Sequence, residues 1–167
     1  MQDTVALLKC LSSGGAEFVV IGGAAAIVYG GAVTTDDLDV CAPLHSDNAV
    51  KIVRALEAVH PRWRTRPDLP VITADSPHLR PGLKNMYLIT DLGKLDVLGE
   101  VPQVCSYPEL AERSIEADFE GVKCRMIDLD TLIAAKRVAG REKDLATLRH
   151  LDVLKKARER YPGAFDP

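Results

Sequence analysis

The chain has 167 residues, of which 47% are hydrophobic and 27% are charged. This length suffices for one domain with its own core, and the composition excludes an intrinsically disordered chain. The net charge of −3 argues against a protein that binds nucleic acid over its whole surface, although it permits a local basic patch.

Charged residues interrupt every long apolar run, so the sequence predicts no membrane span and no membrane partner. The first ten residues, MQDTVALLKC, are too polar for a signal peptide, and we therefore expect a cytoplasmic protein. The cysteines show no metal-binding spacing and are expected to be free, buried thiols. They are Cys10, Cys41, Cys105 and Cys124.

A helix near the N-terminus is the first predicted element. A buried strand follows at Phe18–Ile21, a run of β-branched and aromatic residues. Gly22-Gly23 comes directly after this strand and opens a short helix of small residues that ends at Gly30-Gly31. A glycine pair between a strand and a helix lets the backbone approach a phosphate closely, and the helix N-terminus favours an anion.

Two aspartates alternate with apolar residues in the next predicted strand, Asp37-Leu38-Asp39-Val40. Because alternate residues of a strand share a face, Asp37 and Asp39 are expected to point the same way while Leu38 and Val40 enter the core. Neighbouring carboxylates repel each other unless a cation lies between them or one stays protonated. Such oxygen ligands suit Mg²⁺ held together with substrate phosphates, so the two motifs together suggest a nucleoside triphosphate.

The apolar strand, the glycine pair, the short helix and the Asp-x-Asp strand together resemble the nucleotidyltransferase superfamily, which has the polymerase-beta-like fold. The chain is most similar to the bacterial branch that holds minimal nucleotidyltransferases and the toxins of toxin–antitoxin and abortive-infection modules. In that family the glycine pair holds the triphosphate and the aspartates bind metal ions. The resemblance assigns these roles to Gly22, Gly23, Asp37 and Asp39. The family often has an arginine four residues before the first metal aspartate, a position that Val33 occupies here.

Five prolines between Pro61 and Pro81 predict loops with one short strand at Val71-Ile72-Thr73. Arg62, Arg64 and Arg66 alternate at the start of this segment. If the segment were extended, they would share a face and could contact the phosphates of an acceptor RNA, with Trp63 stacking on a base. The alternative, which is slightly favoured, is a solvated strand with Trp63 in the core.

Two strands at Asn85–Thr90 and Lys94–Leu98, joined by Asp91-Leu92-Gly93, are predicted to form a hairpin. Asp96 lies among apolar residues of the second strand. Either its face is exposed to solvent, or its carboxylate is paired or bound to metal, because burying an unpaired charge is costly. The resemblance implies the second, since the superfamily has a third carboxylate after such a hairpin, as a metal ligand or as the base for the acceptor hydroxyl.

A last hairpin, with strands at 115–119 and 122–127, is predicted at a sheet edge. Asp128 or Asp130 should then cap a helix that ends at Gly140. The apolar stripe of this helix continues at Lys136, which either extends along its own stem to the surface or reaches into the site.

The run from Lys136 to Leu145 resembles the closing signature of the family, a lysine followed by Arg-x-Lys-Asp. This resemblance favours a role for Lys136 in binding the triphosphate. Lys143 would share the face of Lys136 if the helix continued through Gly140, and Asp144 could form an ion pair with either lysine.

The sequence therefore predicts one α/β (α+β) domain over residues 1–167. A small mixed β-sheet with helices packed on it forms a core over about 1–127, and a C-terminal helical pair follows over about 128–160. The predicted catalytic and metal-binding residues are Asp37, Asp39 and Asp96, and the predicted nucleotide-binding residues are Gly22, Gly23, Lys136 and Lys143.

The predicted reaction moves a nucleoside monophosphate from a nucleoside triphosphate to an acceptor, with Mg²⁺ or Mn²⁺ as cofactor. The acceptor could be tRNA, a protein or a small molecule. The chain could be the toxin of a toxin–antitoxin module, with a cognate antitoxin as partner. The alternative hypothesis is a non-catalytic nucleotide-binding or protein-interaction module that retains the fold.

Overall fold

The computed structural model describes residues 1–79 and 82–162. The strands of its main sheet are β1 (Val19–Val20), β2 (Asp37–Cys41), β3 (Arg62–Trp63), β4 (Asn85–Thr90), β5 (Gly93–Leu98), β8 (Ile115–Phe119) and β9 (Val122–Met126). They form a seven-stranded sheet in the order β3-β4-β5-β2-β1-β9-β8, with β1–β9 and β2–β5 parallel and the other pairs antiparallel. Two short strands, β6 (Glu100–Val101) and β7 (Cys105–Ser106), pair separately.

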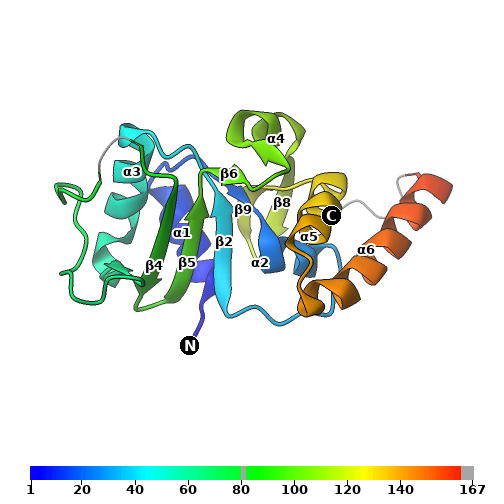
Figure 1. The fold of residues 1–167 in the computed structure, drawn as a ribbon, viewed down its shortest axis with the longest axis horizontal. Helices are drawn as coiled ribbons and strands as arrows, with labels where there is room; N and C mark the ends of the chain where they lie inside the picture. Colours follow the sequence, from blue (N-terminus) through cyan, green and yellow to red (C-terminus); the bar gives the residue numbers. More distant parts are fainter. Residues whose placement is uncertain (80–81, 163–167) are drawn as a thin grey trace.

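The helices are α1 (Thr4–Ser13), α2 (Gly22–Val28), α3 (Ser46–Leu56), α4 (Tyr107–Arg113), α5 (Leu129–Ala139) and α6 (Glu142–Arg160), with a 3-10 turn, η1, at Glu57–Val59. Helices α1 and α3 pack against each other and lie behind the sheet in Figure 1, whereas α5 and α6 form a pair at the opposite end of the molecule from β4. This is the mixed α/β architecture with a C-terminal helical pair that the sequence predicts. Among the described residues, no helix combines the length and the apolar character needed to cross a membrane.

Strand β2 alternates as predicted. Leu38 and Val40 are fully buried in the core, while Asp37 and Asp39 lie on the other face of the sheet and are half-buried. In the parallel pairing of β2 with β5, Asp39 lies directly opposite Asp96. The order of the strands therefore brings the third predicted carboxylate beside the first two.

Both predicted hairpins are present. Strands β4 and β5 pair over Asn85–Thr90 and Gly93–Leu98, and β8 and β9 form the edge of the sheet. Glu120 and Gly121 at the tip of the second hairpin both have positive φ, at 53° and 91°. This is the pattern of a two-residue type I′ turn, whose twist matches that of the flanking strands.

The predicted strand in the proline-rich stretch is wrong. Val71-Ile72-Thr73 forms no strand: the Ile72 N–H donates to the Pro61 carbonyl at 2.7 Å, and its buried side chain fixes a loop against the core. The arginines do not share a strand face either, because β3 ends at Trp63. Trp63 itself is 9% exposed and belongs to the core, as the favoured interpretation has it. Pro81, the last proline of this stretch, lies outside the described residues.

The helix over Leu129–Ala139 begins and ends as predicted. The Asp128 carboxylate accepts a hydrogen bond from the Thr131 N–H at 3.0 Å, and Gly140 ends the helix with a φ of +60°. Since left-handed backbone is easily adopted by glycine, α5 stops there and α6 starts in a new direction at Glu142. The continuous helix that would have placed Lys136 and Lys143 on one face is therefore absent.

The four cysteines are free, as predicted. Cys41 and Cys124 are buried, whereas Cys10 and Cys105 are only half-buried.

Candidate active site

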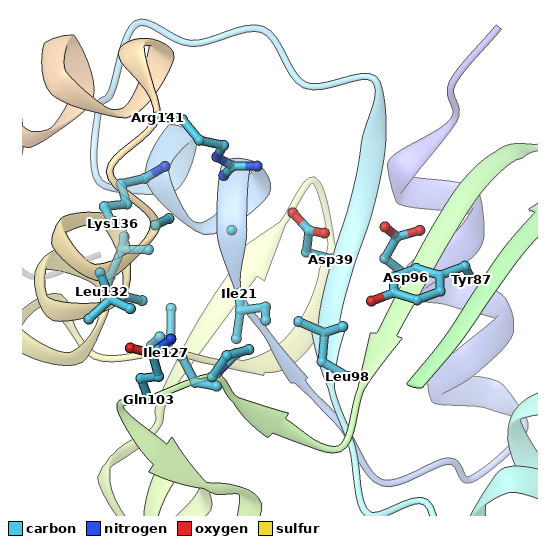
Figure 2. A pocket seen from close by; sticks show the side chains of 16 residues that line it. Ile21, Asp39, Tyr87, Asp96, Leu98, Gln103, Ile127, Leu132, Lys136 and Arg141 are labelled. Atoms are coloured by element: carbon cyan, nitrogen blue, oxygen red, sulfur yellow. The ribbon is translucent and has the colours of Figure 1, made fainter. Parts of the chain in front are cut away.

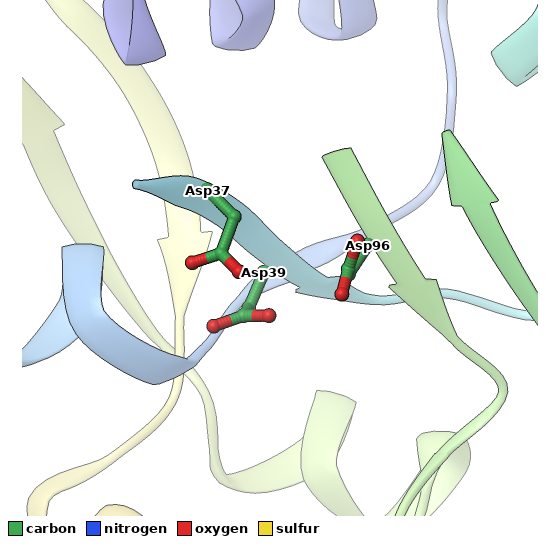
Figure 3. Close-up of side chains that lie close together, drawn as sticks. All are labelled: Asp37, Asp39 and Asp96. Atoms are coloured by element: carbon green, nitrogen blue, oxygen red, sulfur yellow. The ribbon is translucent and has the colours of Figure 1, made fainter. Parts of the chain in front are cut away.

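Three carboxylates meet on the open face of the sheet. Asp37 and Asp39 come from β2 and Asp96 comes from β5, and each offers an oxygen within 4.8 Å of the others (Figure 3). The alternation of β2 and the parallel register of β2 with β5 together produce this arrangement. The three predicted site carboxylates therefore lie together in space.

Burial and repulsion between carboxylates make ionisation of Asp39 and Asp96 unfavourable. Burial, reinforced by the charges of Asp37 and Asp96, raises the pKa of Asp39 to about 6, and the charges of Arg141 and Lys143 oppose this shift. Burial also raises the pKa of Asp96, against a lowering contribution from its hydrogen bond to Arg64. A cation among the three oxygens would relieve the repulsion.

Arg64 holds one oxygen of the third carboxylate. Its guanidinium donates to Asp96 Oδ2 at 2.8 Å and lies over the ring of Tyr87, 5.6 Å from the ring centre. The other oxygen, Asp96 Oδ1, is buried and accepts no hydrogen bond from the described residues. The sequence suggested a phosphate contact for Arg64 only as the less favoured alternative, and it did not predict a contact with Asp96. Arg64 reaches Asp96 because β3, β4 and β5 are adjacent strands of the sheet, and no local sequence pattern encodes that strand order.

The acidic cluster fits a divalent cation. Three carboxylates offer oxygens close together, one buried oxygen accepts no hydrogen bond from residues 1–79 and 82–162, and the pKa of one carboxyl group is raised. Oxygen ligands of this kind suit hard cations such as Mg²⁺. The residues that would hold the ion are Asp37, Asp39 and Asp96.

The glycine pair packs directly against the acidic cluster. A Cβ on Gly22 would lie 2.1 Å from Asp39 Oδ2, and a Cβ on Gly23 would lie 2.7 Å from Thr35 Oγ1. Thr35 in turn donates to Asp37 Oδ1 at 3.1 Å. The absence of side chains at both positions therefore brings the start of α2 against the aspartates, in addition to any approach to a phosphate.

Gly22→Ala is expected to destabilise the protein by about 2–4 kcal/mol, because it combines left-handed backbone strain with a clash against Asp39. Gly15→Ala is the matched control, since Gly15 has a φ of +67°, close to the +65° of Gly22, but no atom within 4 Å of the added carbon. Thermal unfolding of both variants separates the clash from the strain. Equal destabilisation by the two substitutions would contradict the tight packing of Gly22 on Asp39.

A partly buried ion-pair network lies beside the carboxylates. Lys136 Nζ is 2.9 Å from Asp144 Oδ1, and Arg141 Nε is 2.7 Å from Asp144 Oδ2. Lys136 and Asp144 are only 7% and 1% exposed. Burial alone would raise the pKa of Asp144, but the hydrogen bonds from Arg141 and Lys136 outweigh it and lower that pKa. Lys136 therefore does not extend to solvent along its stem.

The predicted nucleotide-binding lysines are placed differently. Lys136 lines a cavity beside the acidic cluster, whereas Lys143 is exposed and does not line it, although its charge opposes the rise in the pKa of Asp39. Arg141, which sequence reasoning missed, lines the cavity instead. The sequence signal that could have identified Arg141 is its position directly after Gly140. Because the helix ends at that glycine, the chain changes direction there and the next side chain no longer follows the helix face.

The cavity itself has a volume of about 430 Å³ and lies between the sheet and α5 (Figure 2). Gly22, Asp39, Asp96, Lys136 and Arg141 line it together with apolar side chains of α5, β5 and the β6–β7 turn. Residues from four separate segments of the sequence thus surround one space, with anionic and cationic groups on its walls.

The sequence matches no protein-family model and no curated protein. Solved structures, in contrast, resemble the fold over most of the chain. A nucleotidyltransferase-like protein of Thermotoga maritima aligns with a TM-score of 0.53 and 17% identity, covering 90% of this chain and 89% of that one.

The antibiotic-resistance factor ANT(2″)-Ia aligns in two structures. Its solution structure has a TM-score of 0.56 at 16% identity, covering 93% of this chain and 89% of that one. Its crystal structure in complex with adenylyl-2″-tobramycin has a TM-score of 0.58 at 16% identity, covering 93% of this chain and 95% of that one. Likeness at such low identity shows the fold alone.

Proposed function

We propose that this chain, whose fold is that of the nucleotidyltransferases, transfers a nucleotidyl group from a nucleoside triphosphate to a hydroxyl-bearing acceptor with the help of a divalent cation. The observation that carries the proposal is the gathering of Asp37, Asp39 and Asp96 beside a cavity that Gly22, Lys136 and Arg141 also line. A metal site and a phosphate site that adjoin one another are what transfer from a triphosphate requires.

The carboxylates would hold Mg²⁺ or Mn²⁺, which when bound neutralises charge on the phosphates. Asp37 and Asp39 share one face of β2, and Asp96 faces them from β5. Arg64 holds Asp96 Oδ2, so Asp96 acts through its remaining oxygen, as a metal ligand or as the base for the acceptor hydroxyl.

Cationic groups on the opposite wall would bind the triphosphate. Lys136 has three N–H donors and Arg141 has five. Each residue uses one donor in its hydrogen bond to Asp144. Within the described part of the chain the remaining donors make no hydrogen bond and could bind phosphate oxygens, while Asp144 keeps both side chains in place. Gly22 and Gly23 let the phosphates approach the backbone, and Lys143 adds positive charge from the first turn of α6.

Calorimetry with ATP, GTP, CTP and UTP tests the proposal. We expect binding in the presence of Mg²⁺ or Mn²⁺ and little binding in EDTA, because three carboxylates would otherwise repel the phosphates. Equal affinity with and without metal would contradict the metal-binding role of the cluster.

Metal binding is expected to depend on pH in a definite direction. Because the pKa of Asp39 is raised to about 6, this carboxyl is protonated below that pH, and protons then compete with the cation. The affinity for Mn²⁺ should therefore fall as the pH is lowered from 7.5 to 5. Electron paramagnetic resonance of free Mn²⁺ measures this affinity at each pH. An affinity that is unchanged across this range would exclude Asp39 as a ligand.

A further inference from the structure

The cavity beside the acidic cluster is divided into two halves of different chemistry. Charged groups occupy the half next to the acidic cluster, and apolar side chains occupy the other (Figure 2). In Figure 2 the apolar half is formed by Ile21, Leu98, Ile127 and Leu132, and Val101 also lines the cavity. A ligand that fills both halves must therefore combine a charged end with a flat or apolar end, and the volume of about 430 Å³ is in the range of small-molecule sites.

Gln103 is the polar residue that lines the apolar half. In Figure 2 it lies with Ile127 and Leu132 on the side of the cavity away from Asp96 and Arg141. Its side chain is exposed, and no other group within residues 1–79 and 82–162 forms a hydrogen bond with its amide. The amide is thus available to a ligand in the cavity.

The backbone of Gln103 is unusual for this residue type. It lies in the tight turn between β6 and β7, where the Val104 N–H donates to the Val101 carbonyl at 3.0 Å, and its φ is +60°. Glycine and asparagine adopt this conformation more readily than glutamine does. The turn therefore holds a long amide side chain at a position where a smaller residue would fit the backbone better, a cost that is commonly found at ligand sites.

We infer that the apolar half of the cavity binds the nucleobase and that Gln103 selects the base by hydrogen bonds to its edge. This inference rests on the proposed function. The amide of glutamine presents an acceptor and a donor side by side, which match paired donors and acceptors on a base edge. The aliphatic side chains around it remove the faces of the base from water, and the triphosphate then extends toward Gly22, Lys136 and Arg141.

The test compares the binding of four Mg²⁺-nucleoside triphosphates to the wild type and to Gln103→Gly by calorimetry. Glycine favours a φ of +60°, so this variant removes the amide without straining the turn. We expect the wild type to prefer one base and the variant to lose that preference. The ratio of the affinity for the preferred triphosphate to the affinity for the others should fall roughly tenfold. Gln103→Asn keeps an amide that is one carbon shorter, and an intermediate ratio is expected.

Inorganic tripolyphosphate with Mg²⁺ serves as the control ligand. It occupies only the charged half, so its affinity for the wild type and for Gln103→Gly should agree. An unchanged ratio among the four triphosphates in Gln103→Gly would overturn the inference, and so would a wild type that binds all four equally. A wild type that binds tripolyphosphate but no nucleotide would also overturn it, whereas binding of neither ligand would overturn the proposed function itself.

Discussion

Asp39→Asn is expected to lower nucleotidyl transfer by at least about a hundredfold while making the metal-free protein more stable. The substitution keeps the shape of the side chain but removes a charge from the centre of the acidic cluster. Transfer is measured with a labelled triphosphate and either cellular RNA or protein as acceptor. If Asp39→Asn retains the transfer activity of the wild type, Asp39 is not a residue of the active site.

The gain in stability follows from the raised pKa of Asp39. Its carboxyl titrates near pH 6 in the folded protein and near 3.8 when free, so the folded state binds more protons between these values. The free energy of unfolding of the wild type therefore falls as the pH rises from about 4 to about 6. A pKa shift of this size lowers the free energy of unfolding by at most about 3 kcal/mol at neutral pH. Asp39→Asn should therefore raise the free energy of unfolding by about 1–3 kcal/mol.

Thermal unfolding in EDTA between pH 4 and pH 8 checks this prediction. Asp36→Asn is the matched control, because it makes the same chemical change at an exposed neighbour outside the cluster. It should change stability by less than about 0.5 kcal/mol and leave transfer intact. A less stable Asp39→Asn protein would contradict the repulsion inferred for the cluster. If the wild type labels no acceptor at all, the non-catalytic binding module becomes the better hypothesis.

Lys136→Met is expected to weaken nucleotide binding by about 10- to 100-fold and also to destabilise the protein. A lysine that merely extended to solvent would have given a neutral or stabilised variant. Here, however, the substitution removes one of two cations that neutralise Asp144, which is 1% exposed. Breaking a buried pair costs about 3–5 kcal/mol, and the remaining contact with Arg141 should reduce this to about 2–3 kcal/mol.

A double variant separates the two effects. Lys136→Met with Asp144→Leu removes both buried charges, so stability should recover while nucleotide binding stays weak. Lys143→Met is the control for charge alone, since Lys143 is exposed. Its stability should be unchanged within about 0.5 kcal/mol, and any loss of binding then measures its predicted contribution to the nucleotide site. A Lys136→Met protein that binds nucleotide like the wild type would remove Lys136 from the site.

Local patterns in the sequence determined most of the elements. The period-2 alternation around Asp37 and Asp39, the turn residues of both hairpins, and the caps at Asp128 and Gly140 each predict a feature that the structure confirms. These signals are readable because side-chain direction and turn geometry depend on a few adjacent residues. The toxin role, the antitoxin partner, and tRNA or protein as the acceptor stay predictions.

Only the tertiary structure decided which side chains meet. Hydrogen bonding between β2 and β5, which are more than fifty residues apart, places Asp96 opposite Asp39, and the neighbouring β3 and β4 bring Arg64 to the same carboxylate. Likewise, the left-handed backbone of Gly140 turns the chain so that Arg141 rather than Lys143 lines the cavity. The physical reason is that strand order and helix direction depend on contacts between distant segments, which no short stretch of sequence contains.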